Sequence, residues 1–325
     1  MKKGKKITLI ILSIILIVIL SAIGGGYYYV TSKLNKIEKV EVNKENLGIN
    51  EELEKNLSTK YGDIQNIALF GTDNVDGMTG RSDSIMILTI DRTNKKAKVT
   101  SIMRDSYVTI PGRAGKDKIN HAYAFGGPEL AIKTLNENFG LNIKDFITVN
   151  FESLPKIVDL VGGIDIEIDQ SELKYINGYI RGINKLNKTN AQEITSAGVQ
   201  HVNGTQAMAY CRIRYTEGGD YKRTERHREI LGKIFEKVQE IPSFKYSGLL
   251  DEVLPMVKTS LKSKDILNIG MDVVKIGGNL EEERFPRDSE ARGDMINGVY
   301  YLTFNENSTK EQIHNWIFEN KNFRN

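Results

Sequence analysis

The feature that most strongly constrains the fold and location of this chain is an uncharged, strongly apolar segment near the N-terminus. It reads ITLIILSIILIVILSAIGGGYYYVTS and lies between Lys6 and Lys33. At about 1.5 Å per residue, roughly 20 such residues in a helix cross the ~30 Å hydrocarbon core of a membrane. Lysines precede the segment, and three tyrosines near its end fit the membrane interface. The pattern predicts one transmembrane helix over residues 7–30.

This anchor places the rest of the chain on one side of the membrane. Lysines before a span stay in the cytoplasm, so we expect a cytoplasmic tail over residues 1–6 and all later residues outside the cell. A cleaved signal peptide is the alternative, but the apolar run is long for one and SAIGGG is a poor cleavage site. We therefore predict a single-pass protein of the cell membrane. Residues 31–62 form a juxtamembrane stalk, helical around NEELEKNLSTKY, and residues 63–325 form the extracytoplasmic domain.

Composition excludes several classes of function. The formal net charge of the 325-residue chain is +3, which is too small to indicate a nucleic-acid partner. Cys211 is the one cysteine, so an intramolecular disulfide and a cysteine-based zinc site are both excluded. The sequence has no Gly-rich Walker loop and no G-x-S-x-G elbow, which disfavours nucleotide hydrolysis and serine hydrolase chemistry.

Strand and helix patterns alternate through the domain. Short apolar or alternating runs predict strands over 64–71, 82–91, 96–103, 146–151, 163–169 and 298–304, with a hairpin across RTNK. Longer runs predict helices over 126–140, 152–163, 204–211, 221–241, 248–261, 264–277 and 308–321. This mixture predicts an α/β fold in which helices flank a central sheet. YINGYIRGINKLNKTN has no legible motif, and we expect loops there that recognise a substrate headgroup.

One short stretch concentrates fixed positive charge. CRIRYTEGGDYKRTERHR, residues 211–228, holds five arginines. Arg212 and Arg214 are two apart and point the same way if the chain is extended there. Arg223, Arg226 and His227 have a spacing that gives them one face of a helix. We expect the two sets to converge on a multiply charged anion, for which the planar fork of arginine is well suited.

Three other segments end strands with charged side chains. Asp73 and Asp83 frame a Gly-containing loop and offer the oxygen ligands that a hard divalent cation such as magnesium prefers. Arg81 precedes Asp83, and SIMRDSYVTIPG places Arg104 beside Asp105. KINHAYAFGGP places Lys118, Asn120 and His121 before a helix N-terminus, where an anion is favoured. Each segment alone also fits an ordinary turn, a surface ion pair or a helix cap, and their convergence is what favours a pyrophosphate site.

Seven collinear motifs resemble those of the LytR-CpsA-Psr family, membrane-anchored extracytoplasmic enzymes of bacterial cell-envelope assembly. They are NIALFGTDN, GRSDSIMILTID, SIMRDSYVTIPG, KINHAYAFGGP, LVGGIDIEI, VNGTQAMAYCRIRY and GGDYKRTERHR, and they cover about residues 63–235. The sequence departs from the family pattern at two positions: His227 stands where the family usually has Gln, and Met103 where it usually has Pro.

The resemblance implies a phosphotransferase with an αβα fold and an apolar pocket for a polyprenyl tail. Such an enzyme moves a phosphorylated anionic glycopolymer, such as a teichoic acid or capsule, from an undecaprenyl-pyrophosphate carrier to peptidoglycan. The acceptor it implies is the 6-hydroxyl of N-acetylmuramic acid. It also implies partners in the lipid-linked glycopolymer, peptidoglycan and membrane lipid, without nucleic acid.

The same resemblance implies roles for particular side chains. Magnesium, or manganese, lies on Asp73 and Asp83. The pyrophosphate is held by Arg81, Arg104, Arg212, Arg214 and Arg223, with His227 at the glutamine position. The catalytic set then comprises Asp73, Arg81, Asp83, Arg104 and Asp105, with Asp73 or Asp105 deprotonating the attacking hydroxyl. Two alternatives stay open: hydrolysis of the lipid-linked pyrophosphate by the same residues, and a tethered module that binds wall polymer without turnover.

Overall fold

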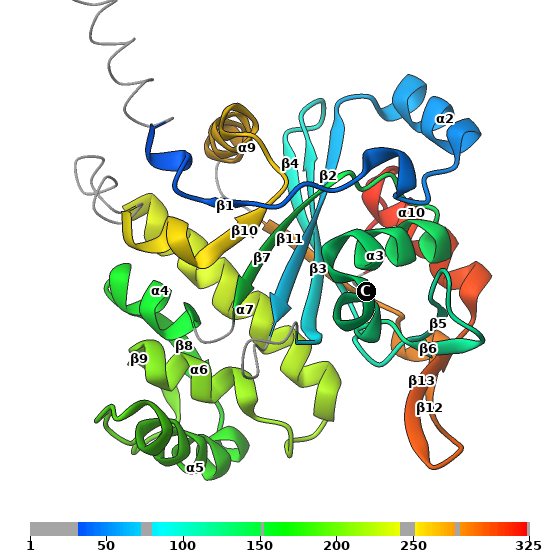
Figure 1. The fold of residues 1–325 in the computed structure, drawn as a ribbon. Coiled ribbons are helices and arrows are strands. Elements are labelled where there is room, and N and C mark those ends of the chain that lie inside the picture. Colours follow the sequence, from blue (N-terminus) through cyan, green and yellow to red (C-terminus); the bar gives the residue numbers. More distant parts are fainter. Residues whose placement is uncertain (1–31, 73–79, 151–152, 241–250, 277–279, 324–325) are drawn as a thin grey trace, which may run out of the picture.

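The computed structural model describes residues 32–72, 80–150, 153–240, 251–276 and 280–323 (Figure 1). A seven-stranded sheet forms the centre. Its strands, in spatial order, are β1 (Glu38–Lys39), β10 (Val257–Thr259), β7 (Asp145–Asn150), β2 (Ile64–Thr72), β3 (Ser82–Asp91), β4 (Lys96–Ile102) and β11 (Leu280–Phe285). The sheet is mixed: β2, β3 and β4 pair antiparallel, while β7 joins β2 and β11 joins β4 in parallel. The predicted central sheet and the β3–β4 hairpin are thus confirmed.

Alternation along the strands gives the sheet two apolar faces. Ala68, Phe70, Ile85 and Ile87 point to one face, where helices α3 (His121–Phe139) and α10 (Glu306–Ile317) complete the largest core cluster. Residues of the opposite parity point to the other face, toward α9 (Ser263–Ile276). The long helix α7 (Gly219–Glu240) crosses beside the sheet (Figure 1). Helices therefore cover both faces of the sheet, as the αβα expectation requires.

A second apolar cluster lies in a lobe beside the sheet. It is built from α4 (Leu154–Leu160), β8 (Ile164–Ile168), α5 (Gln170–Asn187), β9 (Gly198–Val202) and α6 (Gly204–Arg212), together with α7. The loops expected around residues 175–190 are wrong up to Asn187, because α5 is an 18-residue helix. Ile176, Ile180 and Ile183 form its buried stripe, and Asp169 and Glu172 form a capping box at its start.

Two further expectations need correction. The helix expected over 248–261 is wrong for its later residues, where the chain forms a short 3-10 helix (Leu254–Met256) and then strand β10. Pairing with β7 on one side and β1 on the other satisfies the backbone of β10, and this pairing outweighs the local helical pattern. The helix expected to begin at Gly126 begins at His121, with a break at Gly126 and Gly127, whose backbone angles are non-helical.

The segment before residue 63 packs onto the domain. Strand β1 extends the sheet, a 3-10 helix (Lys44–Asn46) follows, and α2 (Glu51–Tyr61) matches the helical pattern found in the sequence. Leu47 and Leu57 are buried in the largest core cluster. The predicted anchor at 7–30 lies outside the described residues. Within the ranges that the structure describes, no helix has the length and apolarity needed to cross a membrane.

Two small hairpins flank the loop that follows β4. Strands β5 (Tyr107–Thr109) and β6 (Lys116–Lys118) pair with each other, and a 3-10 helix (Asp288–Glu290) leads into the hairpin of β12 (Ala291–Ile296) and β13 (Val299–Phe304). The backbone N–H of Leu302 donates to the carbonyl of Asp105 at 2.9 Å. The second hairpin is thereby tied to the loop that carries Arg104 and Asp105.

Candidate active site

Charged side chains from three separate elements meet at one end of the sheet. Asp83 lies at the start of β3, Arg104 and Asp105 follow β4, and Asp220 and Arg223 lie in the first turns of α7. The Arg104 guanidinium contacts three carboxylates: Asp83 at 2.7 Å, Asp220 at 3.3 Å and Asp105 at 3.5 Å. The convergence of Asp83, Arg104, Asp105 and Arg223, expected from strand ends and an arginine-rich helix, is therefore present.

Each carboxylate around Arg104 has a second cation nearby. Lys118 lies 2.7 Å from Asp105, Arg223 lies 3.1 Å from Asp220, and Arg214 lies 4.0 Å from Asp83. Such a network holds several guanidinium groups in fixed positions before any anion arrives. Preorganised charge of this kind is what phosphoryl transfer requires of a protein.

Asp83 is ionised in this network. Burial would raise the pKa of its carboxyl group, but Arg104, Arg223 and Arg214 outweigh that effect and hold the pKa below its ordinary value. The pKa of Arg104 moves in the opposite sense: burial would lower it, but Asp220, Asp83 and Asp105 raise it. The pair is therefore charged throughout the physiological pH range.

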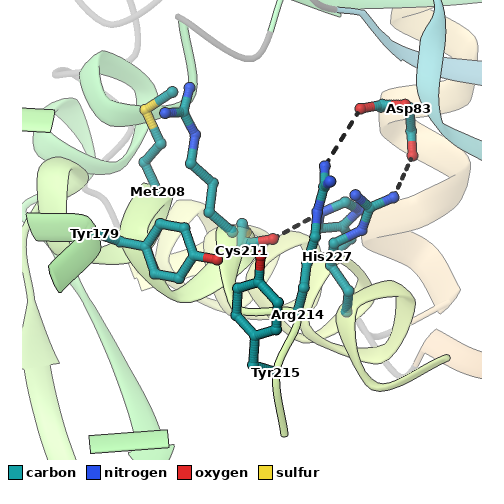
Figure 2. Close-up of a pocket in the computed structure, with 9 residues that line it drawn as sticks. Asp83, Tyr179, Met208, Cys211, Arg214, Tyr215 and His227 are labelled. Atoms are coloured by element: carbon teal, nitrogen blue, oxygen red, sulfur yellow. Dashed lines mark hydrogen bonds and ion pairs between the residues drawn. The ribbon is translucent and has the colours of Figure 1, made fainter. Parts of the chain in front are cut away.

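A cavity of about 320 Å³ opens beside this network (Figure 2). Its charged wall includes Asp83, Arg212, Arg214 and Arg223. The rest of its lining is formed by Tyr179, Met208, Cys211, Tyr215 and His227. A cavity that combines guanidinium groups with aromatic and apolar side chains suits a ligand that has an anionic part joined to a less polar part.

Arg212 and Arg214 reach the cavity by a different route from the one expected. Arg212 is the last residue of α6, and the extended backbone begins at Ile213. The expectation of an extended chain carrying both arginines is therefore wrong for Arg212. Both side chains nevertheless line the same cavity, because the chain turns out of the helix between them.

The arginine-rich stretch divides between the cavity and the core. Arg226 is fully buried, donates to Glu172 at 2.8 Å and to the carbonyl of Ile213 at 3.0 Å, and so joins α7 to α5. Arg228 is also buried, and it pairs with Glu282 of β11 at 3.2 Å. The expectation that Arg226 shares a ligand-facing surface with Arg223 is wrong, because Arg226 serves the packing of the lobe.

His227 and Cys211 lie in the cavity wall as neutral groups. Burial, with Arg223 as the next cause, lowers the pKa of His227 to about 3. Its Nε2 donates to the carbonyl of Cys211 at 3.3 Å. Burial likewise raises the pKa of the Cys211 thiol to about 12, so this cysteine behaves as a small apolar side chain.

Asp73 and Arg81 are the remaining two residues expected in the site. Asp73 falls outside the described residues, so the pair it was expected to make with Asp83 stays a prediction. Arg81 lies within the described residues and is exposed. Burial would raise the pKa of the Asp117 carboxyl group, but His121 and the charge of Arg81 lower it. Among the described residues, no group of three histidine, cysteine or acidic side chains forms a metal cluster.

Sequence reasoning missed Asp220, Tyr179 and Tyr215. Asp220 follows two glycines at the start of α7, where an acidic residue favours the helix N-terminus, and this position was a usable signal. Tyr179 lies on α5, which was not expected to be a helix. Lys118 was expected to lie near a bound anionic ligand. Its ammonium group instead contacts the carboxylate of Asp105 within the protein.

Comparison with known proteins identifies relatives across most of the chain. Residues 26–316 match the LytR_cpsA_psr family. A protein of Enterococcus faecalis named polyisoprenyl-teichoic acid–peptidoglycan teichoic acid transferase TagU is 32% identical over 245 residues, 74% of each chain. A protein of the same name from Bacillus mycoides is 32% identical over 251 residues, 77% of this chain and 76% of its own.

Solved structures are similar in fold. TagT bound to LIIa-WTA superposes with a TM-score of 0.61 at 26% identity, covering 78% of this chain and 90% of that one. The LytR-CPS2A-psr family protein YwtF (TagT) with bound octaprenyl pyrophosphate lipid gives 0.57 at 26% identity, covering 79% and 91%.

Proposed function

Because this chain belongs to the LytR-CpsA-Psr family, we propose that it is a transferase that attaches a phosphorylated anionic glycopolymer to peptidoglycan. The donor is the polymer on an undecaprenyl-pyrophosphate carrier, and the acceptor is a peptidoglycan hydroxyl, the 6-hydroxyl of N-acetylmuramic acid. The polymer is a teichoic acid, a capsular polysaccharide or another secondary wall polysaccharide. Relatives named as teichoic acid transferases, and a related structure with bound octaprenyl pyrophosphate, support this proposal.

The observation that carries the proposal is the preorganised guanidinium network beside the cavity. Arg212, Arg214 and Arg223 line the cavity, and Arg104 lies behind Asp83 at 2.7 Å. These groups hold the two phosphates of the donor, together with Arg81, which is exposed and directly precedes β3. Tyr179, Met208 and Tyr215 line the less polar side, where the first part of the prenyl chain leaves the pyrophosphate.

The reaction exchanges the phosphoanhydride linkage of the donor pyrophosphate for a phosphodiester linkage to the acceptor. The acceptor oxygen attacks the phosphorus that carries the polymer and forms the new phosphodiester bond. The bond from that phosphorus to the bridging oxygen breaks, and undecaprenyl phosphate leaves with the electron pair. Guanidinium groups stabilise the charge that accumulates on the phosphate oxygens during this exchange.

A divalent cation fits the donor set in part. Asp83 is ionised, and its Oδ2 is 4.0 Å from Arg214, so that this oxygen is available to a hard cation. We propose magnesium or manganese on Asp83 and Asp73. When bound, the cation neutralises charge on the pyrophosphate.

The proton of the acceptor hydroxyl passes to Asp73 or Asp105. Asp105 is held by Lys118 at 2.7 Å through Oδ1 and by Arg104 at 3.5 Å through Oδ2. Two cations on Asp105, and the divalent cation proposed on Asp73, lower the basicity of both carboxylates, so the base is assigned by the effect of each substitution. Asp73→Asn and Asp105→Asn distinguish the two, because only loss of the base removes the acidic limb of the pH–rate profile.

We place the chain in the cell membrane as a single-pass protein with its N-terminus in the cytoplasm. The lysines and the apolar run at residues 7–30 support this topology. The catalytic domain then lies outside the membrane, on the side where peptidoglycan is found. Cysteine-accessibility labelling at position 4 and at position 320 of a Cys211→Ala chain in intact cells tests the topology.

The decisive experiment uses the full chain in lipid nanodiscs. A synthetic prenyl-pyrophosphate disaccharide and peptidoglycan oligomers are supplied with magnesium or with EDTA, and Asp73→Ala and Asp83→Asn are compared with the wild type. A magnesium-dependent phosphodiester-linked product, lost in both variants, is the expected result. Release of phosphorylated sugar without linkage would indicate a hydrolase, and tight binding without turnover would indicate a binding module.

A further inference from the structure

The β12–β13 hairpin stands beside the charged network on the side away from the α5–α6 lobe (Figure 1). Ser106 bridges to Leu302, and the Leu302 N–H donates to the Asp105 carbonyl at 2.9 Å. The hairpin is thus fixed to the loop that carries Arg104 and Asp105. Its position relative to that loop does not depend on long flexible connections.

A glycine on this hairpin allows an aromatic ring to pack closely against the strand. Gly293 directly opposes Leu302 and lies diagonally across from Tyr300, two residues from Met295, which directly opposes Tyr300. A Cβ at Gly293 would lie 2.6 Å from Cε2 and 2.9 Å from the hydroxyl oxygen of Tyr300. The ring therefore lies closely over the Gly293 backbone, and a side chain at position 293 would displace it.

The apolar surface at this place is exposed rather than packed. Tyr300 is 44% exposed and Met295 is 66% exposed, although Leu302 on the same face is buried. Apolar side chains that lie together in solvent without packing against the core indicate a binding surface. One edge of the Tyr300 ring is held by Gly293, which leaves the remaining face to a ligand.

Tyr300 borders the reacting groups. The Nζ of Lys118 is 5.9 Å from the centre of the Tyr300 ring and 2.7 Å from Asp105. The pKa of Tyr300 is raised by burial and then by the carboxylates of Asp105 and Asp220, which agrees with this placement. A ring over Tyr300 would therefore lie next to the carboxylate network and outside the cavity lined by Tyr179 and Tyr215.

We propose that Tyr300, seated on Gly293, is a stacking platform for a sugar ring of the acceptor glycan strand. This inference rests on the proposed function, because it assigns the acceptor of that reaction to the hairpin side and the lipid-linked donor to the cavity side. The C–H groups on one face of a sugar ring pack against an aromatic ring, while its hydroxyls stay in water or meet Lys118 and Asp105.

The test compares three variants in the full chain: Tyr300→Ala removes the ring, Tyr300→Phe keeps it, and Gly293→Ala keeps the tyrosine but displaces it. Binding of soluble peptidoglycan glycan oligomers is measured by calorimetry without donor, and the KM values of donor and acceptor are measured in the transfer assay. Tyr300→Ala and Gly293→Ala should weaken glycan binding and raise the acceptor KM about tenfold, the scale of one aromatic contact. Tyr300→Phe should change both by less than about twofold, with the donor KM unchanged throughout.

The outcomes separate this inference from the proposed function. Unchanged glycan binding and acceptor KM in Tyr300→Ala overturn the platform, even if the wild type transfers polymer normally. A rise in the donor KM instead of the acceptor KM also overturns it, as does the absence of glycan binding to the wild type. Loss of glycan binding in Tyr300→Ala without any transfer by the wild type would keep the platform and overturn the proposed function. Tyr215→Ala, at the cavity, is the matched contrast and should raise the donor KM alone.

Discussion

At the scale of single residues, His227 links the site to acid stability. Its pKa is lowered to about 3 by burial and by Arg223, whereas its ordinary value is 6.5. In the unfolded chain the imidazole takes up a proton as the pH falls below 6.5, and in the folded protein it does not until about pH 3. Stability from this group is therefore complete above pH 6.5 and is lost progressively as the pH falls toward 3.

We predict that His227→Gln reduces this loss. Glutamine cannot be protonated, and its amide keeps a donor for the Cys211 carbonyl. At pH 5 the free energy of unfolding of the variant, relative to its own value at pH 7.5, should fall by about 2 kcal/mol less than that of the wild type. Urea denaturation at the two pH values measures this difference. Equal acid sensitivity in the two proteins would contradict the neutral, buried state of His227.

Arg104 and Arg226 have different predicted roles although both belong to motifs that resemble those of the family. Arg226→Ala leaves the buried Glu172 carboxylate without its cation and should cost about 3–5 kcal/mol of stability. Arg104→Ala should lower the transfer rate by about 10²–10³, the effect of removing one transition-state donor. Its effect on stability should be smaller, since Lys118, Arg223 and Arg214 each remain near one of the carboxylates that it contacts.

Chemical denaturation and the transfer assay measure these two effects separately. The double variant Arg226→Met with Glu172→Gln is the control, because it removes the charge and its partner together and should recover at least half of the lost stability. A stable Arg226→Ala protein without transfer activity would place Arg226 in the site instead. The sequence could not separate these two arginines, because burial depends on where α5 packs.

At the scale of elements, α5 shows what the sequence signal contained and what obscured it. Ile176, Ile180 and Ile183 have helical spacing and Asp169 precedes the run, but two glycines and several asparagines interrupt it. Those residues lower helix propensity, and the packing of the isoleucine stripe into the lobe outweighs them. Strand β10 is the reverse case, where an apolar helical pattern yields to pairing with β7. Local patterns were sufficient for β2, β3 and β4, each of which has an antiparallel partner adjacent in the sequence.

Gly182 in α5 should be replaceable with a gain in stability. A Cβ at this position meets open space, and the helix needs no glycine there. Gly182→Ala should raise the free energy of unfolding by about 0.5–1 kcal/mol, because the unfolded chain loses conformational freedom and the helix propensity rises. Thermal denaturation followed by circular dichroism measures the shift.

Gly204, at the start of α6, is the matched control. A Cβ there would lie 1.9 Å from the backbone oxygen of Pro155, where α4 approaches closely. Gly204→Ala should therefore destabilise the lobe, in contrast to Gly182→Ala. Equal behaviour of the two variants would mean that α4 and α6 are not in close contact.

At the scale of the whole molecule, the site is assembled from segments far apart in the chain. The pairing of β3 with β4 brings Asp83 and Arg104 together at one end of the sheet, α7 adds Asp220, and the separate β12–β13 hairpin carries Tyr300. The sequence predicted the charged strand ends because short motifs carry them. It could not predict the contribution of the hairpin, because the bridge from Ser106 to Leu302 joins residues almost 200 positions apart.

The domain boundary predicted at residue 63 separates side chains that pack together. Leu34, Ile37, Leu47 and Leu57 precede it, and all four are buried against later parts of the chain. Burying one such side chain contributes about 1.5–3 kcal/mol, so four contribute an amount comparable with the 5–15 kcal/mol that stabilises a typical domain. We therefore expect a fragment over 63–325 to lack a cooperative thermal transition, and a fragment over 32–325 to retain one.

Calorimetry and limited proteolysis of the two fragments test this expectation. In the shorter fragment, β10 would become an edge strand and the pocket that receives Leu47 would open to water. Supplying residues 32–62 as a separate peptide should restore part of the transition, because the contacts are noncovalent. A shorter fragment that melts cooperatively within a few degrees of the longer one would show instead that this segment is a stalk laid against a domain that is already complete.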